Sequence, residues 1–157
     1  MDKFSDSRDA QPAAGFLGAE VMALPLRFNG ATWDRLRNNV ELTLLASAVR
    51  AADNNTPDQV NYNHRGVIVV VDMTVVPGVD IVTPKIQGKD PVSGKYYDIL
   101  AGVGIVAVST VVLRVFNGIT VTANLAVSDL LPRTWRLFMD HSAATNFTYS
   151  AGGILLL

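Results

Sequence analysis

The residues that could carry out acid–base, nucleophilic or metal chemistry are few in this chain. It contains 2 histidines and no cysteine, which excludes a disulfide scaffold, a zinc–thiolate site and a cysteine nucleophile. His64 and His141 are far apart in the sequence, and each borders a loop. The run Asp140-His141-Ser142 does not predict a catalytic triad, because neighbouring residues on a strand point to opposite faces. We therefore predict no catalytic and no metal-binding residue, and we expect that the protein is not an enzyme.

Two glycine-containing segments resemble nucleotide-binding motifs without matching them. A phosphate-binding loop has four residues between its glycines and a Ser or Thr after the lysine, whereas Gly88 and Gly94 enclose five residues and Tyr96 follows Lys95. Gly102-Val103-Gly104 lacks the third glycine and the helix of a dinucleotide-binding fingerprint. We expect a hairpin turn at the first segment and a close strand contact or bulge at the second, and no cofactor at either.

Two sets of residues bear on carbohydrate chemistry. Asp72 and Asp98 would form the carboxylate pair of a glycoside hydrolase only if their strands were neighbours. A glycan-binding module instead needs exposed aromatic side chains in one row. The candidates for such a row are the tyrosines, Tyr62, Tyr96, Tyr97 and Tyr149.

The composition restricts the class of protein. Its 157 residues are sufficient for one domain with a hydrophobic core, and they are 49% hydrophobic and only 17% charged, with a mean hydropathy of +0.26. A net charge of −1 provides no basic excess to neutralise phosphates, so we expect no nucleic-acid partner. The longest weakly polar stretch, residues 99–113, is shorter than the roughly 20 residues of a membrane-spanning helix. With no signal sequence at the start, a soluble protein made in the cytoplasm is expected.

The hydrophobic pattern predicts an all-β fold. Residues 36–52 fit a helix, because Leu36, Val40, Leu44 and Ala48 recur at four-residue spacing, but the alternation of Val40, Leu42 and Leu44 with polar residues favours a strand. From residue 66 onward, β-branched runs are separated by turn residues. The expected strands are residues 67–75, 81–87, 95–100, 103–108, 110–116, 133–139 and 146–157, with 121–123 as a short edge. Eight or nine short strands predict a single β-sandwich or jelly-roll-like domain.

Residues 1–35 differ from this body, which spans residues 36–157. Pro12, Pro25 and several glycines interrupt any long helix, and apolar residues are scattered between them. We predict an extended N-terminal arm whose apolar side chains contact a partner. The predicted partner-binding residues are Phe16, Leu17, Leu24, Leu26, Phe28 and Trp33, whereas Trp135 is expected in the core.

Several strands of the body are apolar on both faces. Val67, Val69 and Val71 can face a core, yet Ile68 and Val70 occupy the other side of the same strand. A monomer rarely exposes a large apolar patch. Either the arm covers this second face, or the chain forms a homo-oligomer or binds a larger surface. We favour the second interpretation, although both can hold together.

A specific resemblance adds to this interpretation. The segments that carry it are Lys85 to Tyr97 (KIQGKDPVSGKYY), Leu44 to Ala48 (LLASA), Asn61 to Val67 (NYNHRGV), Leu131 to Arg136 (LPRTWR) and Thr148 to Ser150 (TYS). Together they resemble a widespread set of small tailed-bacteriophage proteins, β-sandwich proteins from structural gene clusters, over residues 40–157.

The resemblance implies a structural virion protein assembled in the host cytoplasm. It implies a capsid decoration, or cement, protein whose partners are the major capsid protein and further copies of itself, as a dimer or trimer. A tail or head–tail connector protein and a carbohydrate-binding module are the alternatives. The resemblance brings no catalytic residue.

Overall fold

The structure, a computed structural model, describes residues 26–28, 31, 33–35, 39–78 and 80–157. The chain divides into two units, Met1–Arg37 and Asn38–Leu157. In the first unit, β1 (Leu26–Phe28) and β2 (Trp33–Arg35) pair as an antiparallel hairpin. The second unit contains two five-stranded sheets, and the described residues include no helix. The predicted all-β class and the sandwich of the body are therefore confirmed.

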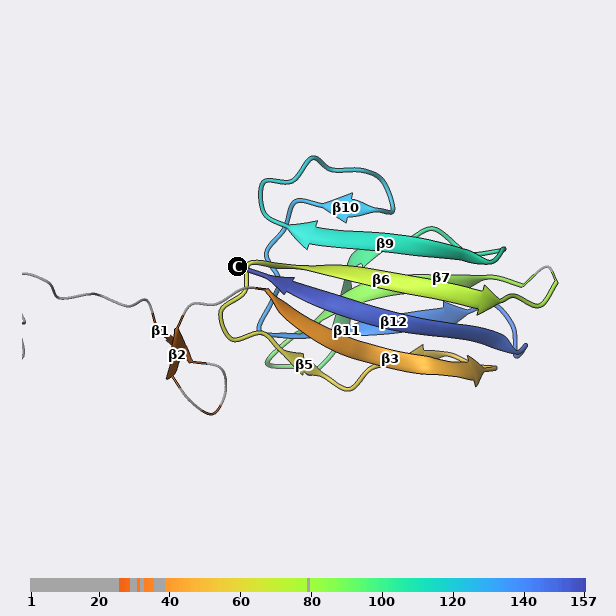
Figure 1. Cartoon of the computed structure of the whole chain (residues 1–157), viewed down its shortest axis with the longest axis horizontal. Coiled ribbons are helices and arrows are strands. Elements are labelled where there is room, and N and C mark those ends of the chain that lie inside the picture. Colours follow the sequence, from red (N-terminus) through yellow and green to blue (C-terminus); the bar gives the residue numbers. More distant parts are fainter. Residues whose placement is uncertain (1–25, 29–30, 32, 36–38, 79) are drawn as a thin grey trace, which may run out of the picture. The chain divides into compact units, whose positions relative to one another are not determined.

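One sheet, called the front sheet because it lies in front in Figure 1, has the order β10-β9-β6-β12-β3. Its strands are β3 (Val40–Arg50), β6 (Gly66–Val75), β9 (Ser109–Phe116), β10 (Ala126–Val127) and β12 (Phe147–Leu156). All pairings are antiparallel except that of β10 with β9. The C-terminal strand β12 is central and lies between β6 and β3, which gives its apolar residues two paired neighbours.

The other sheet, called the back sheet, has the order β4-β11-β7-β8, with β5 also paired to β11. Its strands are β4 (Asn54–Asn55), β5 (Gln59–Val60), β7 (Val82–Lys89), β8 (Tyr96–Ala101) and β11 (Thr134–His141). The hairpin predicted around residues 88–95 joins β7 to β8. Gly94 adopts a positive φ of 70°, the left-handed conformation that the turn requires and that glycine adopts without strain.

The core lies between the two sheets and follows the two-residue period of their strands. On β6, Val67, Val69, Val71 and Met73 are all fully buried, as the alternation predicts. The back sheet contributes Trp135, Leu137 and Met139 from β11 and Ile86 from β7, also fully buried. Trp135 is thus a core residue, as expected.

Three sequence-based predictions of elements can be compared with the strands. Residues 40–50 are a strand, which confirms the favoured interpretation for this part of residues 36–52, whereas residues 36–38 lie outside the described residues. The prediction of a strand at 103–108 is wrong: only Ile105 pairs, in a single bridge with Val82. The prediction of an edge strand at 121–123 is also wrong, since Thr122 makes only an isolated bridge to Ala126.

The failed strand at 103–108 has a physical cause. This segment carries the chain from β8 in the back sheet to β9 in the front sheet, so it cannot follow either sheet over its length. Gly102, at its start, donates its N–H to the Pro84 carbonyl at 2.8 Å. A Cβ on Gly102 would lie 2.9 Å from that same oxygen, which is the close strand contact predicted for this glycine.

Candidate functional site

The outer surface of the front sheet carries a group of apolar side chains that the core does not use. They alternate with the buried residues of the three central strands and are half-buried. The group, called the outer apolar face, consists of Ile68 and Val70 on β6, Val112 and Phe116 on β9, and Ile154 and Leu156 on β12. In Figure 1 this surface faces the viewer, and no other element of residues 39–157 crosses it.

The pairing register arranges this face in rows across the sheet. Ile154 lies beside Ile68, and in the next row Gly152 lies beside Val70, which is itself beside Val112. In the row on the opposite side of the Ile154–Ile68 pair, Leu156 lies beside Gly66. Of the two glycines, Gly152 leaves a hollow in the face, whereas the space at Gly66 is filled by the Phe116 side chain.

Opposite charges stand at the two sides of one of these rows. The row Glu41, Ile154, Ile68 and Arg114 runs across four strands, from β3 to β9. Glu41 and Arg114 are both exposed, and within the part of the chain that the structure describes neither makes an ion pair. Towards one end the face becomes polar, where the Thr110 hydroxyl donates to Asp72 at 2.9 Å.

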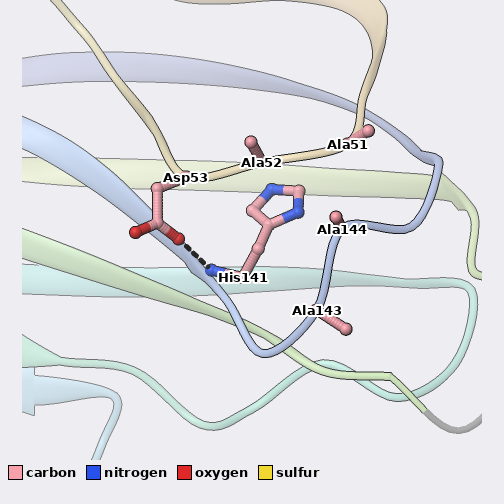
Figure 2. A pocket seen from close by; sticks show the side chains of 6 residues that line it. All are labelled: Ala51, Ala52, Asp53, His141, Ala143 and Ala144. Atoms are coloured by element: carbon pink, nitrogen blue, oxygen red, sulfur yellow. Dashed lines mark hydrogen bonds between the residues drawn. The ribbon is translucent and has the colours of Figure 1, made fainter.

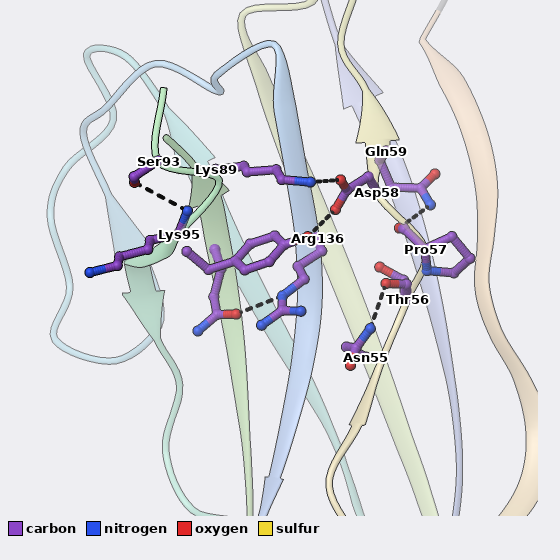
Figure 3. Close-up of polar contacts among 11 residues, drawn as sticks. Asn55, Thr56, Pro57, Asp58, Gln59, Lys89, Ser93, Lys95 and Arg136 are labelled. Atoms are coloured by element: carbon purple, nitrogen blue, oxygen red, sulfur yellow. Dashed lines mark hydrogen bonds and ion pairs between the residues drawn. The ribbon is translucent and has the colours of Figure 1, made fainter. Parts of the chain in front are cut away.

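The outer surface of the back sheet is polar and internally paired (Figure 3). Lys89 Nζ lies 2.6 Å from Asp58 Oδ2, and the Tyr96 hydroxyl donates to the other oxygen of Asp58 at 2.6 Å. The Arg136 guanidinium stacks 3.4 Å above the Tyr96 ring and donates to Gln87 at 2.8 Å. The hydrogen bond from Lys89, followed by that from Tyr96, lowers the pKa of Asp58. This surface satisfies its own charges, in contrast to the front sheet.

A shallow pocket lies at one end of the sandwich (Figure 2). Its volume is about 310 Å³, and it is lined by Ala51, Ala52, Asp53, His141, Ala143 and Ala144. His141 Nε2 lies 3.0 Å from the Tyr149 hydroxyl, and the His141 backbone N–H donates to Asp53 at 2.8 Å. Burial lowers the pKa of His141 and raises the pKa of Tyr149 to about 12. The contact between the His141 imidazole and the Tyr149 hydroxyl links β11 of the back sheet to β12 of the front sheet.

The run Asp140-His141-Ser142 is divided among three different partners. Asp140 forms an ion pair with Lys85 at 2.7 Å, while Ser142 Oγ accepts a hydrogen bond from the Ile81 N–H at 2.9 Å. His141 is directed to Tyr149. These three residues therefore do not form a triad, and the described residues contain no group of three side chains suited to hold a metal ion.

The two carbohydrate arrangements do not form. Asp72 is on β6 in the front sheet and Asp98 on β8 in the back sheet, so their strands are not neighbours. Tyr149 is fully buried, and Tyr96 and Tyr97 are successive residues of β8 that point to opposite faces. At most two of the four tyrosines can therefore share one exposed row.

Only some of the predicted arm contacts lie within the described residues. Phe16, Leu17 and Leu24 lie outside them. Leu26, Phe28 and Trp33 lie on the β1–β2 hairpin, where Phe28 is paired with Trp33. The sequence analysis predicted an extended arm here and missed the second strand, Trp33–Arg35. The sequence signal that could have found it is the pair Asn29-Gly30, which is typical of a hairpin turn followed by a return strand.

No protein-family model, curated protein or solved structure matches the chain. Among the described residues, no helix is long and apolar enough to cross a membrane.

Proposed function

We propose that this chain is a structural protein of a tailed-phage virion, a decoration protein that binds the major capsid protein and stabilises the head. The observation that supports the proposal is the outer apolar face, a half-buried apolar surface that suits a protein acting in association with other protein chains. A decoration protein stabilises a shell by linking capsid subunits, and many symmetric copies multiply a weak contact into a strong one.

The two surfaces of the sandwich suit this role. The back sheet presents a paired polar network, in which Lys89 and Asp58 neutralise each other and the Tyr96 hydroxyl donates to Asp58, and such a surface suits contact with water. The front sheet presents apolar side chains that water solvates poorly. We assign the contact with the capsid to the N-terminal residues selected from the sequence, above all Leu17 and Leu24.

The direct test is binding of the full-length protein to capsids assembled from the major capsid protein of the same structural gene cluster. The expected result is stoichiometric co-sedimentation with the capsids and cryo-microscopy density for a sandwich on their outer surface. The paired change Leu17→Asp and Leu24→Asp is expected to weaken binding at least tenfold. The control Val92→Asp, at a turn residue that is 94% exposed, should bind as the parent does.

Two results would contradict the proposal. Absence of the protein from the capsid pellet under conditions in which the fold is intact would exclude the decoration role. Density at the tail or at the head–tail joint would instead support a tail or connector protein.

A further inference from the structure

We propose that the outer apolar face binds the same face of a second copy of the chain, about a two-fold axis that runs parallel to the strands between β6 and β12. This deepens the proposed function by naming the partner of that surface, and it rests on the same face. In a two-fold dimer the same surface of both copies forms the interface. If residue i of one copy contacts residue j of the other, then residue j of the first copy contacts residue i of the second. Rotating the face about this axis therefore shows which of its residues would meet in the dimer.

Rotation about this axis brings opposite charges together. The axis exchanges the two sides of the sheet, so that Glu41 of one copy lies opposite Arg114 of the other, and Arg114 lies opposite Glu41. Each dimer then has two such pairs, one at each side of the interface. A two-fold axis perpendicular to the strands would instead place Glu41 against Glu41 and Arg114 against Arg114, which is unfavourable. The charges therefore select the parallel axis.

The same rotation places a large side chain over a hollow. Val70 of one copy lies over Gly152 of the other. Leu156 lies over Gly66, where the Phe116 side chain already fills the space. Gly152 has open space on its outer side: an added Cβ would have only the Leu42 carbonyl oxygen nearby, at 3.8 Å. Ile68 meets Ile154 in the row between them. Two such sheets pack about 10 Å apart, as the two layers of a sandwich do.

The size of the face sets the expected strength. Four strands span about 19 Å and seven residues about 23 Å, so a face-to-face pair buries on the order of 1,000 Å² in total. This is the lower end of the range for specific interfaces, which favours a dissociation constant in the micromolar range. Decoration proteins act in many copies, where such a contact is sufficient.

The test is sedimentation equilibrium of the full-length protein across a concentration series. The parent chain is expected to dimerise, and Glu41→Arg or Arg114→Glu is expected to weaken the dimer about tenfold or more, because each replaces two attractive pairs with two repulsive ones. The doubly changed chain should recover the parent affinity. An equimolar mixture of the two single variants should also dimerise, because both contacts are then attractive.

Two controls separate the face from the fold. Lys95→Glu reverses an exposed charge in the β7–β8 turn and should leave the dimer unchanged. Val70→Asp is expected to abolish dimerisation while retaining the thermal unfolding midpoint of the dissociated chain. Val121→Asp, at a loop residue that is 64% exposed, should alter neither property.

Several outcomes would overturn the inference. A monomer at all concentrations would exclude a second copy as the partner of the outer apolar face. A dimer that the single charge reversals do not weaken, or that the double change does not restore, would have a different interface. Capsid binding by a monomeric protein would overturn only this inference, whereas a dimer that does not bind capsids would overturn only the proposed function.

Discussion

At the scale of single residues, Arg50 stabilises an irregular part of the front sheet. Relative to β12, strand β3 contains extra residues near Leu45, so the ladder is interrupted there. The Arg50 guanidinium donates to the Ala46 carbonyl at 2.7 Å, to the Ala48 carbonyl at 3.1 Å and to the Tyr149 carbonyl at 2.7 Å. It thereby satisfies carbonyls at the irregular end of the strand.

Arg50→Lys tests this role. A lysine ammonium is a single point charge and cannot reproduce the fork of donors that reaches three carbonyls. We expect the free energy of unfolding to fall by about 1–3 kcal/mol in urea titrations. Arg65→Lys, at an exposed arginine that has no part in the proposed interface, is the matched control and should change it by less than about 0.5 kcal/mol. Equal effects at both positions would show that the carbonyl contacts contribute nothing specific.

His141 gives the stability of the chain a dependence on pH. Burial, the main cause, lowers the pKa of His141 below its usual 6.5; Arg50 lowers it further, and Asp53 and Asp140 oppose the shift. As the pH falls below about 6.5, the unfolded chain binds a proton at this histidine before the folded chain does. The free energy of unfolding is therefore expected to decrease from pH 7.5 to pH 5.5.

The check is urea unfolding of the parent and of His141→Gln at several values of pH within this window. The parent should lose stability as the pH falls, and the variant should show a smaller slope because it lacks the titrating group. Identical slopes would assign the dependence to other residues. Asp58, whose pKa is lowered from 3.8, acts in the same direction only at a more acidic pH.

At the scale of elements, the surroundings of two glycines on neighbouring strands predict opposite effects of a change to alanine on stability. A Cβ on Gly66 of β6 would overlap the Val115 backbone oxygen of β9, whereas a Cβ on Gly152 of β12 meets open space. Gly66→Ala is expected to force β6 and β9 apart and to cost about 2 kcal/mol or more. Gly152→Ala should be neutral or slightly stabilising, because alanine restricts the unfolded chain more than glycine does.

Thermal unfolding at low protein concentration measures both effects on the monomer. The pair is informative because the two changes are chemically identical and lie in the same sheet. A loss of stability in Gly152→Ala as large as that in Gly66→Ala would mean that flexibility of the strands, rather than space, determines the effect.

How far the sequence predicts the structure can be judged from particular elements. β6 was predicted accurately because Val67, Val69 and Val71 alternate within a β-branched run, and burial of one face then specifies the register. Residues 103–108 have the same valine-rich character, yet they connect the two sheets. Local propensity does not distinguish a paired strand from a largely exposed connection between two sheets.

The site was less predictable than the fold. Apolar residues on both faces of β6 and β9 were recognised in the sequence, but the row from Glu41 to Arg114 depends on four strands that are distant in the chain. The pairing of β12 with both β3 and β6 creates that row. Likewise, the contact of Asp58 with Lys89 and Tyr96 depends on the neighbouring positions of β5, β11 and β7.

At the scale of the whole molecule, the two outer surfaces of the sandwich divide its tasks. The charges of the back sheet are paired within one chain. Added salt screens only exposed ion pairs there, and each of these contributes little to stability. The front sheet leaves Glu41 and Arg114 without an ion pair among the described residues, at the two sides of an apolar face. Self-association should therefore respond to salt in a manner specific to that face.

The expected response has two parts of opposite sign. Sodium chloride screens the two pairs between Glu41 and Arg114 of the copies, so the dissociation constant should rise a few-fold between about 0.05 and 0.5 M. Ammonium sulfate strengthens apolar burial and should lower the dissociation constant at the same ionic strength. The uncharged double variant Glu41→Gln with Arg114→Gln should lose the response to sodium chloride and retain the response to sulfate. If the variant keeps the full response to sodium chloride, the charges that the salt screens lie elsewhere, and the parallel two-fold axis loses its electrostatic basis.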